Sequence, residues 1–87
     1  MSFYVYMLKS KGAITITYVG YTNDLKKRIN QHNSGKGAKF TRGRKWTLIY
    51  KEKFKSKNEA ISREYYIKKH RYLRNRIKNE NSNPITL

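Results

Sequence analysis

The sequence predicts an α+β domain built on a small three-stranded antiparallel sheet with flanking helices, in the order ββαβα(α). Two segments of aromatic and β-branched residues near the start of the chain are separated by a short link, which is typical of a β-hairpin. A third such segment lies mid-chain. Elsewhere the apolar residues take helical spacing, with capping residues in front of them.

The first two strands are expected at residues 3–9 and 14–19, joined by a turn at residues 10–13. The first is apolar enough to be buried on both faces, and the second consists almost wholly of β-formers. Residues 20–23, which begin with Gly20, are predicted to leave the sheet as a turn. The third strand is expected at residues 46–54.

The first helix is expected at residues 24–33, with Thr22 or Asn23 as its N-cap and Asp24 in its first turn. Ser34 and the glycine after it are predicted to end this helix.

The second helix is expected to begin at a capping box, in which Ser56 is the N-cap and Glu59 reaches back. It runs to about Lys69, and a further helical stretch at residues 72–79 either continues it or packs beside it. Residues 1–80 therefore form a single domain, and residues 81–87 are expected to be a frayed tail.

The net charge and the absence of cysteine limit the classes of function that the chain can have. The 87 residues include 21 Lys and Arg against five Asp and Glu, a formal charge of +16. Such a charge favours a polyanionic partner, nucleic acid first and an anionic membrane surface second. The chain has no cysteine, which excludes disulfides and thiolate metal sites. It shows no signal-peptide pattern and no apolar run of about 20 residues, so a soluble cytoplasmic protein is expected.

One acidic residue of the second helix is placed unusually. On a helical wheel Glu64 falls near the centre of an apolar arc formed by Ala60, Ile61, Tyr65 and Ile67. One interpretation is an ion pair with Lys68, four residues on and on the same arc. The other is a functional carboxylate that faces a site.

The first helix carries two further candidates. Arg28 and His32 lie one turn apart along one margin of the apolar stripe that Leu25 and Ile29 form. A surface arginine and a surface histidine are one interpretation. The other is an anion site, because an arginine binds phosphate through two parallel hydrogen bonds.

The segment 35–45 is predicted to be a flexible basic loop that contacts a nucleic-acid backbone. Its cationic residues are Lys36, Lys39, Arg42, Arg44 and Lys45. Phe40 lies among them, and it occupies the position where the GxGxxG pattern requires its last glycine. A solvated run of charge without a partner is the alternative interpretation. Two histidines without a cysteine make zinc a poor fit, and the chain has no cluster of carboxylates for a two-metal site.

Together these residues resemble the GIY-YIG nuclease domain over about residues 3 to 70. The signature tripeptides are Tyr4-Val5-Tyr6 and Tyr18-Val19-Gly20, and Arg28, His32 and Glu64 follow them. The chain is most similar to the small stand-alone bacterial GIY-YIG proteins. It departs from the signature in having Tyr4 in place of glycine and valine twice in place of isoleucine.

The resemblance implies a metal-dependent endonuclease that hydrolyses nucleic-acid phosphodiester bonds, with DNA as the first candidate substrate and repair or recombination as its setting. It implies that Tyr6 and Tyr18 are the signature tyrosines and that Arg28 stabilises the transition state. It also implies that Glu64 binds one Mg²⁺ or Mn²⁺ ion, without an organic cofactor. Either Asn75 or Asn79 corresponds to a late asparagine of the family.

Three questions stay open at this point. Tyr18 is the family's usual base, whereas His32 has the more suitable intrinsic pKa; we favour Tyr18 assisted by His32. The alternatives to a nuclease are a nucleic-acid-binding module without turnover and a basic structural protein of a ribonucleoprotein. The sequence assigns no oligomeric state.

Overall fold

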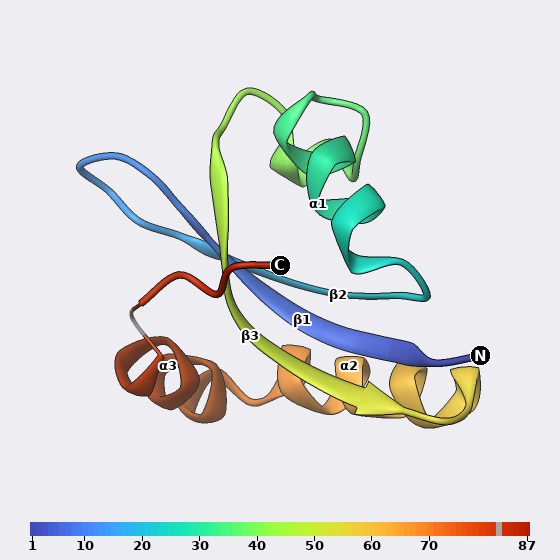
Figure 1. Ribbon diagram of the computed structural model, residues 1–87. Coiled ribbons are helices and arrows are strands. Elements are labelled where there is room, and N and C mark those ends of the chain that lie inside the picture. Colours follow the sequence, from blue (N-terminus) through green and yellow to red (C-terminus); the bar gives the residue numbers. More distant parts are fainter. Residues whose placement is uncertain (82) are drawn as a thin grey trace.

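The computed structural model describes residues 1–81 and 83–87 of the chain. Strands β1 (Phe3–Ser10), β2 (Thr17–Thr22) and β3 (Trp46–Phe54) form one antiparallel sheet in the order β2-β1-β3. Figure 1 shows helix α1 (Leu25–Asn33) on one face of the sheet and helices α2 (Lys57–Lys69) and α3 (Arg71–Glu80) on the other. The predicted class, sheet and element order are confirmed.

The sheet has an apolar core on each face, because successive side chains of a strand point to opposite sides. One core lies beneath α2 and α3, and its buried members are Val5, Met7, Val19, Ile49, Ala60, Ile67 and Ile77. The other lies beneath α1, and its buried members are Tyr6, Leu8, Leu25, Trp46 and Leu48. The central strand therefore supplies both cores, and it fixes where each helix can pack.

The second strand lies three residues later than expected. β2 covers Thr17–Thr22, whereas Ile14 is 78% exposed in the hairpin loop. The loop closes where Ser10 donates its backbone N–H to the Ile16 carbonyl and accepts from the Ile16 N–H at its hydroxyl, both at 2.9 Å. Pairing with β1 decides the register, since Tyr4 lies opposite Thr22. The predicted turn at residues 20–23 is therefore wrong for Gly20 and for the two residues after it, which belong to the strand.

Helix α1 begins one residue later than predicted. Asp24 is its N-cap and not a residue of its first turn, because Asp24 Oδ1 accepts the Lys27 N–H at 3.2 Å. Thr22 accepts the Asp24 N–H at 3.1 Å and so shapes the approach to the helix. The helix ends at Ser34, as predicted.

The basic loop is less open than predicted. A short 3₁₀ helix, η1 (Lys39–Thr41), lies at its centre, and Thr41 is fully buried. The cations on either side of Thr41 point into solvent, while this one threonine anchors the loop to the body of the protein.

Helix α2 begins as predicted, at Ser56. The Ser56 hydroxyl accepts the Glu59 N–H at 3.2 Å and lies 2.9 Å from Glu59 Oε1. The helical conformation is interrupted at His70. Helix α3 is therefore separate from α2 and packs beside it.

The C-terminal segment, expected to be a frayed tail, touches the sheet at one point. Ile85 donates its N–H to the Leu48 carbonyl at 2.8 Å and packs against the core beneath α1. In the part of the chain that the structure describes, no helix is long and apolar enough to cross a bilayer.

Candidate active site

The strand register places Tyr6 and Tyr18 on the same face of the sheet. Tyr6 lies opposite Gly20, and Tyr18 lies opposite Leu8, so the two tyrosines are diagonal neighbours. Their ring centroids are 6.4 Å apart. Gly20 makes room for this pair, because a Cβ there would lie 2.5 Å from the Tyr6 hydroxyl oxygen and 3.1 Å from Tyr18 Cε2. The glycine serves a close approach within the sheet and not a turn.

His32 of α1 lies against both tyrosines and is fully buried, so its interpretation as a surface histidine is wrong. Its Nε2 is 2.7 Å from the Tyr6 hydroxyl, and its Nδ1 is 2.9 Å from the Thr41 hydroxyl. The His32 and Tyr18 ring centroids are 5.0 Å apart. Leu25 and His32 are the buried residues of α1, so the histidine faces the sheet directly.

The loop around His32 is held by close packing at Gly37 and by hydrogen bonds between side chains and backbone groups. A Cβ at Gly37 would lie 2.5 Å from His32 Nδ1, so only glycine fits there without displacement. At the end of α1, the Asn33 side chain accepts the Trp46 N–H at 2.6 Å and donates to the Trp46 carbonyl at 3.2 Å. The indole N–H of Trp46 donates to the Thr41 carbonyl at 2.9 Å. Hydrogen bonds therefore tie helix α1, the loop and β3 together around the imidazole.

Arg28 lies one turn before His32 and is half-buried. Its Nη1 donates to Gln31 Oε1 at 3.1 Å. Its positive charge lowers the pKa of both Tyr6 and Tyr18, against the larger effect of burial. A guanidinium next to two hydroxyl groups can pair with an anionic oxygen that enters between them.

The charge of Glu64 influences the same tyrosines from α2, the helix on the other face of the sheet. Its side chain is 18% exposed, and its charge raises the pKa of Tyr6 and of Tyr18. The predicted pair with Lys68 is present, with Lys68 Nζ 3.8 Å from Glu64 Oε1. Lys68 Nζ also lies 5.7 Å from the centroid of the Tyr18 ring. The interpretation of Glu64 as an ion-pair partner of Lys68 is therefore confirmed, and its interpretation as a functional carboxylate stays a prediction.

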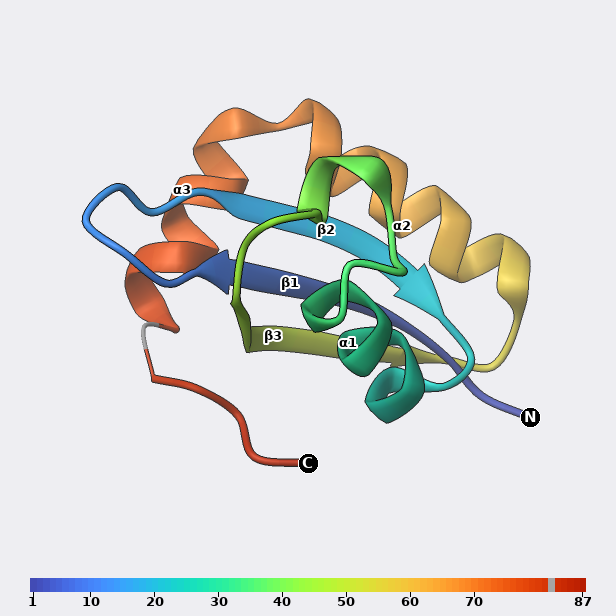
Figure 2. The same cartoon turned by 90° about the horizontal axis from the view of Figure 1, so that it is seen from above.

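The predicted apolar arc of the second helix is only partly buried. Ala60 and Ile67 face the core, whereas Ile61 is 37% exposed and Tyr65 is 58% exposed. Glu64 therefore lies at the margin of the buried side and not at its centre. This position is compatible with a functional carboxylate, because α2 runs alongside the edge strand β2 (Figure 2).

The site keeps its two tyrosines and its histidine neutral. Burial raises the pKa of Tyr6 and of Tyr18, and Glu64 adds to both shifts. Burial and the Arg28 charge lower the pKa of His32 to about 4. At neutral pH the imidazole is therefore uncharged, with one nitrogen that donates and one that accepts.

A groove runs along the free edge of β2, beside Tyr18. Its lining residues come from β2, η1, α2 and α3 and are Thr17, Tyr18, Val19, Phe40, Lys68 and Arg74. Figure 2 shows the loop that carries η1 crossing over β2, with α2 alongside the strand. Phe40 is 58% exposed and stacks on Tyr18, with the ring centroids 6.1 Å apart. The groove thus combines aromatic surface with two cations, a combination suited to an extended nucleic-acid strand.

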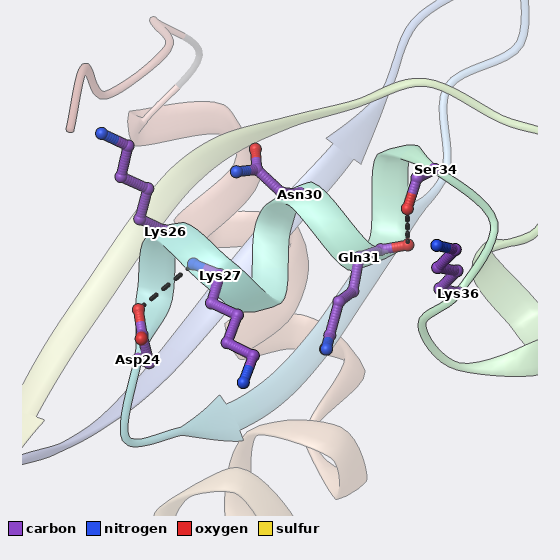
Figure 3. Close-up of a pocket in the computed structure, with 7 residues that line it drawn as sticks. All are labelled: Asp24, Lys26, Lys27, Asn30, Gln31, Ser34 and Lys36. Carbon is purple, nitrogen blue, oxygen red and sulfur yellow. Dashed lines mark hydrogen bonds between the residues drawn. The ribbon is translucent and has the colours of Figure 1, made fainter.

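The five predicted backbone-binding cations are all exposed on the loop between α1 and β3: Lys36, Lys39, Arg42, Arg44 and Lys45. Lys45 donates to the Asn33 carbonyl at 3.4 Å. Lys36 lines a shallow hollow on the outer face of α1, together with Lys26 and Lys27 (Figure 3). Neither Tyr18 nor Glu64 lines that hollow, so it is not the place where the tyrosines meet.

The donor set at Glu64 suits one hard cation. Among residues 1–81 and 83–87, no three His, Cys, Asp or Glu side chains gather into a metal site. A single carboxylate is nevertheless a normal protein contribution for Mg²⁺, which keeps several waters and takes further oxygens from substrate phosphates. The Lys68 ammonium group, 3.8 Å from Glu64 Oε1, competes with such an ion for this carboxylate.

Several residues at the site escaped prediction from the sequence as functional groups. Thr41 and Gly37 contact His32 across the loop, and no local pattern marks either of them. Arg74 lines the groove from α3. Asn75 and Asn79 are both exposed on α3, and neither lines the groove, so the choice between them stays open.

Comparison with known proteins identifies this arrangement. A family model described as the GIY-YIG catalytic domain matches residues 2–82. The chain belongs to the GIY-YIG family. The resemblance noted from the signature residues is thereby confirmed.

Relatives extend the match to small bacterial proteins. A UPF0213 protein of Clostridium perfringens is 58% identical over 67 residues, which cover 76% of this chain and 70% of the relative. The UPF0213 protein YazA of Bacillus subtilis is 57% identical over 53 residues, covering 60% of this chain and 54% of YazA. A solution NMR structure of a UPF0213 protein from Bacillus halodurans is similar in fold, with a TM-score of 0.56 and 41% identity over 97% of this chain and 89% of that one. This GIY-YIG chain thus has UPF0213 proteins among its relatives, and the family implies a nuclease-type function.

Proposed function

We propose that this GIY-YIG protein is an endonuclease that hydrolyses phosphodiester bonds of DNA with one Mg²⁺ or Mn²⁺ ion, in the cytoplasm and in the service of DNA repair or recombination. One observation carries the proposal. Arg28 on α1 and Glu64 on α2 belong to helices on opposite faces of the sheet, yet the charge of each shifts the pKa of Tyr18, Arg28 downward and Glu64 upward. A cation and a carboxylate that both influence one phenol are the groups that phosphodiester hydrolysis needs. Of the three, Tyr18 lines the groove.

Tyr18 is the group that takes a proton from the attacking water. It lines the groove, whereas His32 is buried with both ring nitrogens engaged and cannot meet a water directly. His32 assists through Tyr6, whose hydroxyl it holds at 2.7 Å. The free protein keeps Tyr18 neutral, so its ionisation depends on added positive charge near Glu64.

Arg28 and Glu64 have opposite tasks. Arg28 stabilises the negative charge that builds up on the phosphate oxygens, and such a contact contributes about 100- to 1000-fold in rate. Glu64 holds the divalent ion, and the bound ion supplies positive charge that offsets Glu64 and favours ionisation of nearby hydroxyl groups. The basic loop and the groove bind the strand on either side of the reacting bond.

The test is a cleavage assay with Mg²⁺ or Mn²⁺ on duplex, single-stranded and branched DNA, with RNA of the same sequences alongside. We expect Glu64→Gln to lower the rate at least ~100-fold, because loss of a metal ligand removes several kcal/mol of transition-state stabilisation. Arg28→Ala should have a similar effect. The exposed ion pair on α3 supplies matched controls, since Glu80→Gln and Arg76→Ala make the same charge changes away from the groove. Equal cleavage by Glu64→Gln and wild type would sink the proposal.

A nucleic-acid-binding module without turnover is the second candidate. The observation in its favour is the Glu64–Lys68 pair, in which a lysine already neutralises the proposed metal ligand. This candidate predicts salt-sensitive binding to DNA without cleavage. Fluorescence anisotropy separates the two, because Glu64→Gln removes a negative charge and should leave the affinity of a pure binder unchanged or higher.

A further inference from the structure

Thr41 occupies a place that the proposed chemistry does not yet explain. Within loop residues 35–45, all of which the structure describes, it alone is fully buried. Lys39 and Arg42 on either side of it are exposed. Burial of a hydroxyl group is unfavourable unless hydrogen bonds satisfy it, so the hydrogen bonds of Thr41 should explain its position.

The hydrogen bonds of Thr41 have a fixed direction. Its hydroxyl donates to the Ala38 carbonyl at 2.7 Å, and a carbonyl oxygen can only accept. The single hydroxyl proton of Thr41 is therefore donated to the Ala38 carbonyl. The 2.9 Å contact between Thr41 Oγ1 and His32 Nδ1 must then use a proton of the imidazole.

This direction determines the tautomer of His32. The neutral imidazole carries one N–H, and the contact with Thr41 places it on Nδ1. Nε2 therefore presents a lone pair to the Tyr6 hydroxyl 2.7 Å away, and Tyr6 donates to it. The resulting chain runs from Tyr6 through His32 and Thr41 to the Ala38 carbonyl, each group donating to the next.

We infer that Thr41 is a positioning residue, which holds His32 as the Nδ1–H tautomer so that Nε2 accepts a hydrogen bond from the Tyr6 hydroxyl. Because the Tyr6 hydroxyl then donates to His32, the lone pairs of its oxygen remain free to accept a hydrogen bond from another donor. Without the Thr41 acceptor, the imidazole can place its proton on Nε2 and donate to Tyr6, which reverses the polarity of the contact. The catalytic part of this inference rests on the proposed nuclease function, whereas the tautomer itself does not.

An ordinary explanation of Thr41 makes a different prediction. A threonine in a short helix often donates to a carbonyl three residues back, and the contact with His32 would then only fill a gap. In that case removal of the hydroxyl would lower stability and leave the histidine tautomer as it was.

The test is the ring ¹⁵N spectrum of histidine-labelled protein at neutral pH. We expect wild-type His32 to show a protonated Nδ1 and an unprotonated Nε2, with the exposed His70 as a reference in the same spectrum. Thr41→Val, which keeps the shape of the side chain and removes the acceptor, should convert His32 wholly or partly to Nε2–H. Thr41→Ser should keep the wild-type pattern. A wild-type His32 protonated on Nε2 overturns the inference even if Thr41→Val does not fold, and so does an unchanged tautomer in Thr41→Val.

Cleavage kinetics test the catalytic part. We expect Thr41→Val to lower kcat about tenfold with KM within twofold, and Thr41→Ser to restore most of the rate. Ser10→Ala is the matched control, because it also removes a buried hydroxyl but lies at the hairpin, and it should change stability alone. If wild type does not cut nucleic acid, the proposed function fails while the tautomer result still decides the assignment of Thr41. An unchanged kcat in Thr41→Val refutes its part in catalysis.

Discussion

Gly20→Ala tests the packing on which the whole site depends. Gly20 has ordinary strand backbone, so alanine meets no conformational penalty there and gains about 0.4–1 kcal/mol from a less flexible unfolded chain. The added Cβ, however, would lie 2.5 Å from the Tyr6 hydroxyl oxygen and 2.7 Å from Tyr6 Cζ. Ordinary contacts begin near 3.4 Å, so the tyrosine ring must move by about 0.9 Å (3.4 − 2.5).

That movement has two costs. Overpacking a core typically costs about 1–3 kcal/mol. Displacing Tyr6 also breaks its 2.7 Å hydrogen bond and leaves a buried nitrogen of His32 without a partner, which costs about 1–3 kcal/mol more. After the gain from alanine is subtracted, we expect Gly20→Ala to lower the free energy of unfolding by about 3 kcal/mol, within a range of about 1–5.5 kcal/mol. This is a large part of the ~4–13 kcal/mol expected for a chain of this length.

Urea unfolding followed by tryptophan fluorescence measures the loss, because Trp46 is the single, buried tryptophan. Tyr6→Leu provides the control background, since it removes the ring that the new methyl group meets. In that background Gly20→Ala should cost less than ~0.5 kcal/mol or stabilise the protein. A neutral or stabilising effect of Gly20→Ala in the wild-type background would refute the close approach of Tyr6 to the strand.

Three further predictions concern charge. The folded pKa of His32, about 4, lies below its unfolded value near 6.5, so its contribution to stability is full above pH 6.5 and is lost as the pH falls through 4. Wild type should lose roughly 3 kcal/mol more than His32→Gln over that range in pH-dependent urea unfolding. Lys39→Ala should reduce the slope of log affinity for DNA against log salt by about 0.7–0.9, whereas Lys53→Ala, exposed on the far edge strand β3, should leave it unchanged. Glu52→Gln weakens a two-point pair with Arg63, in which both contacts are 2.9 Å, and should cost about 1 kcal/mol of stability without changing cleavage.

The sequence predicted correctly those elements whose boundaries depend on residues within the same segment. The capping serine at residue 56, the apolar run of β1 and the alternation of β3 each describe a segment without reference to another. The second strand failed because Ile14 and Ile16 have high β-propensity, yet the partner strand ends the pairing at Thr17. Register is a property of two strands, and propensity describes one.

The site shows the same division. The signature residues identified Tyr6, Tyr18, Arg28, His32 and Glu64 as a group, and the structure brings the three rings into contact. Their surroundings could not be predicted. Gly20 resembled a turn residue because glycine is uncommon inside strands. Its place in β2 is explained by Tyr6 on the neighbouring strand, whose hydroxyl group leaves no room for a Cβ. Thr41 carries no pattern at all, since its partner lies nine residues away on another element.

The position of the site follows from the topology of the sheet. Helices α1 and α2 pack on opposite faces, so side chains from the two can meet only around an edge of the sheet. β2 is such an edge, and Tyr18 is the residue of that strand which Arg28 influences from one face and Glu64 from the other. Tyr6 on the central strand β1 is influenced by the same two charges, but it is buried, whereas Tyr18 on β2 lines the groove. The free edge of β2 is therefore what lets two helices on opposite faces complete one site, and it also leaves the groove open along which a strand can reach it.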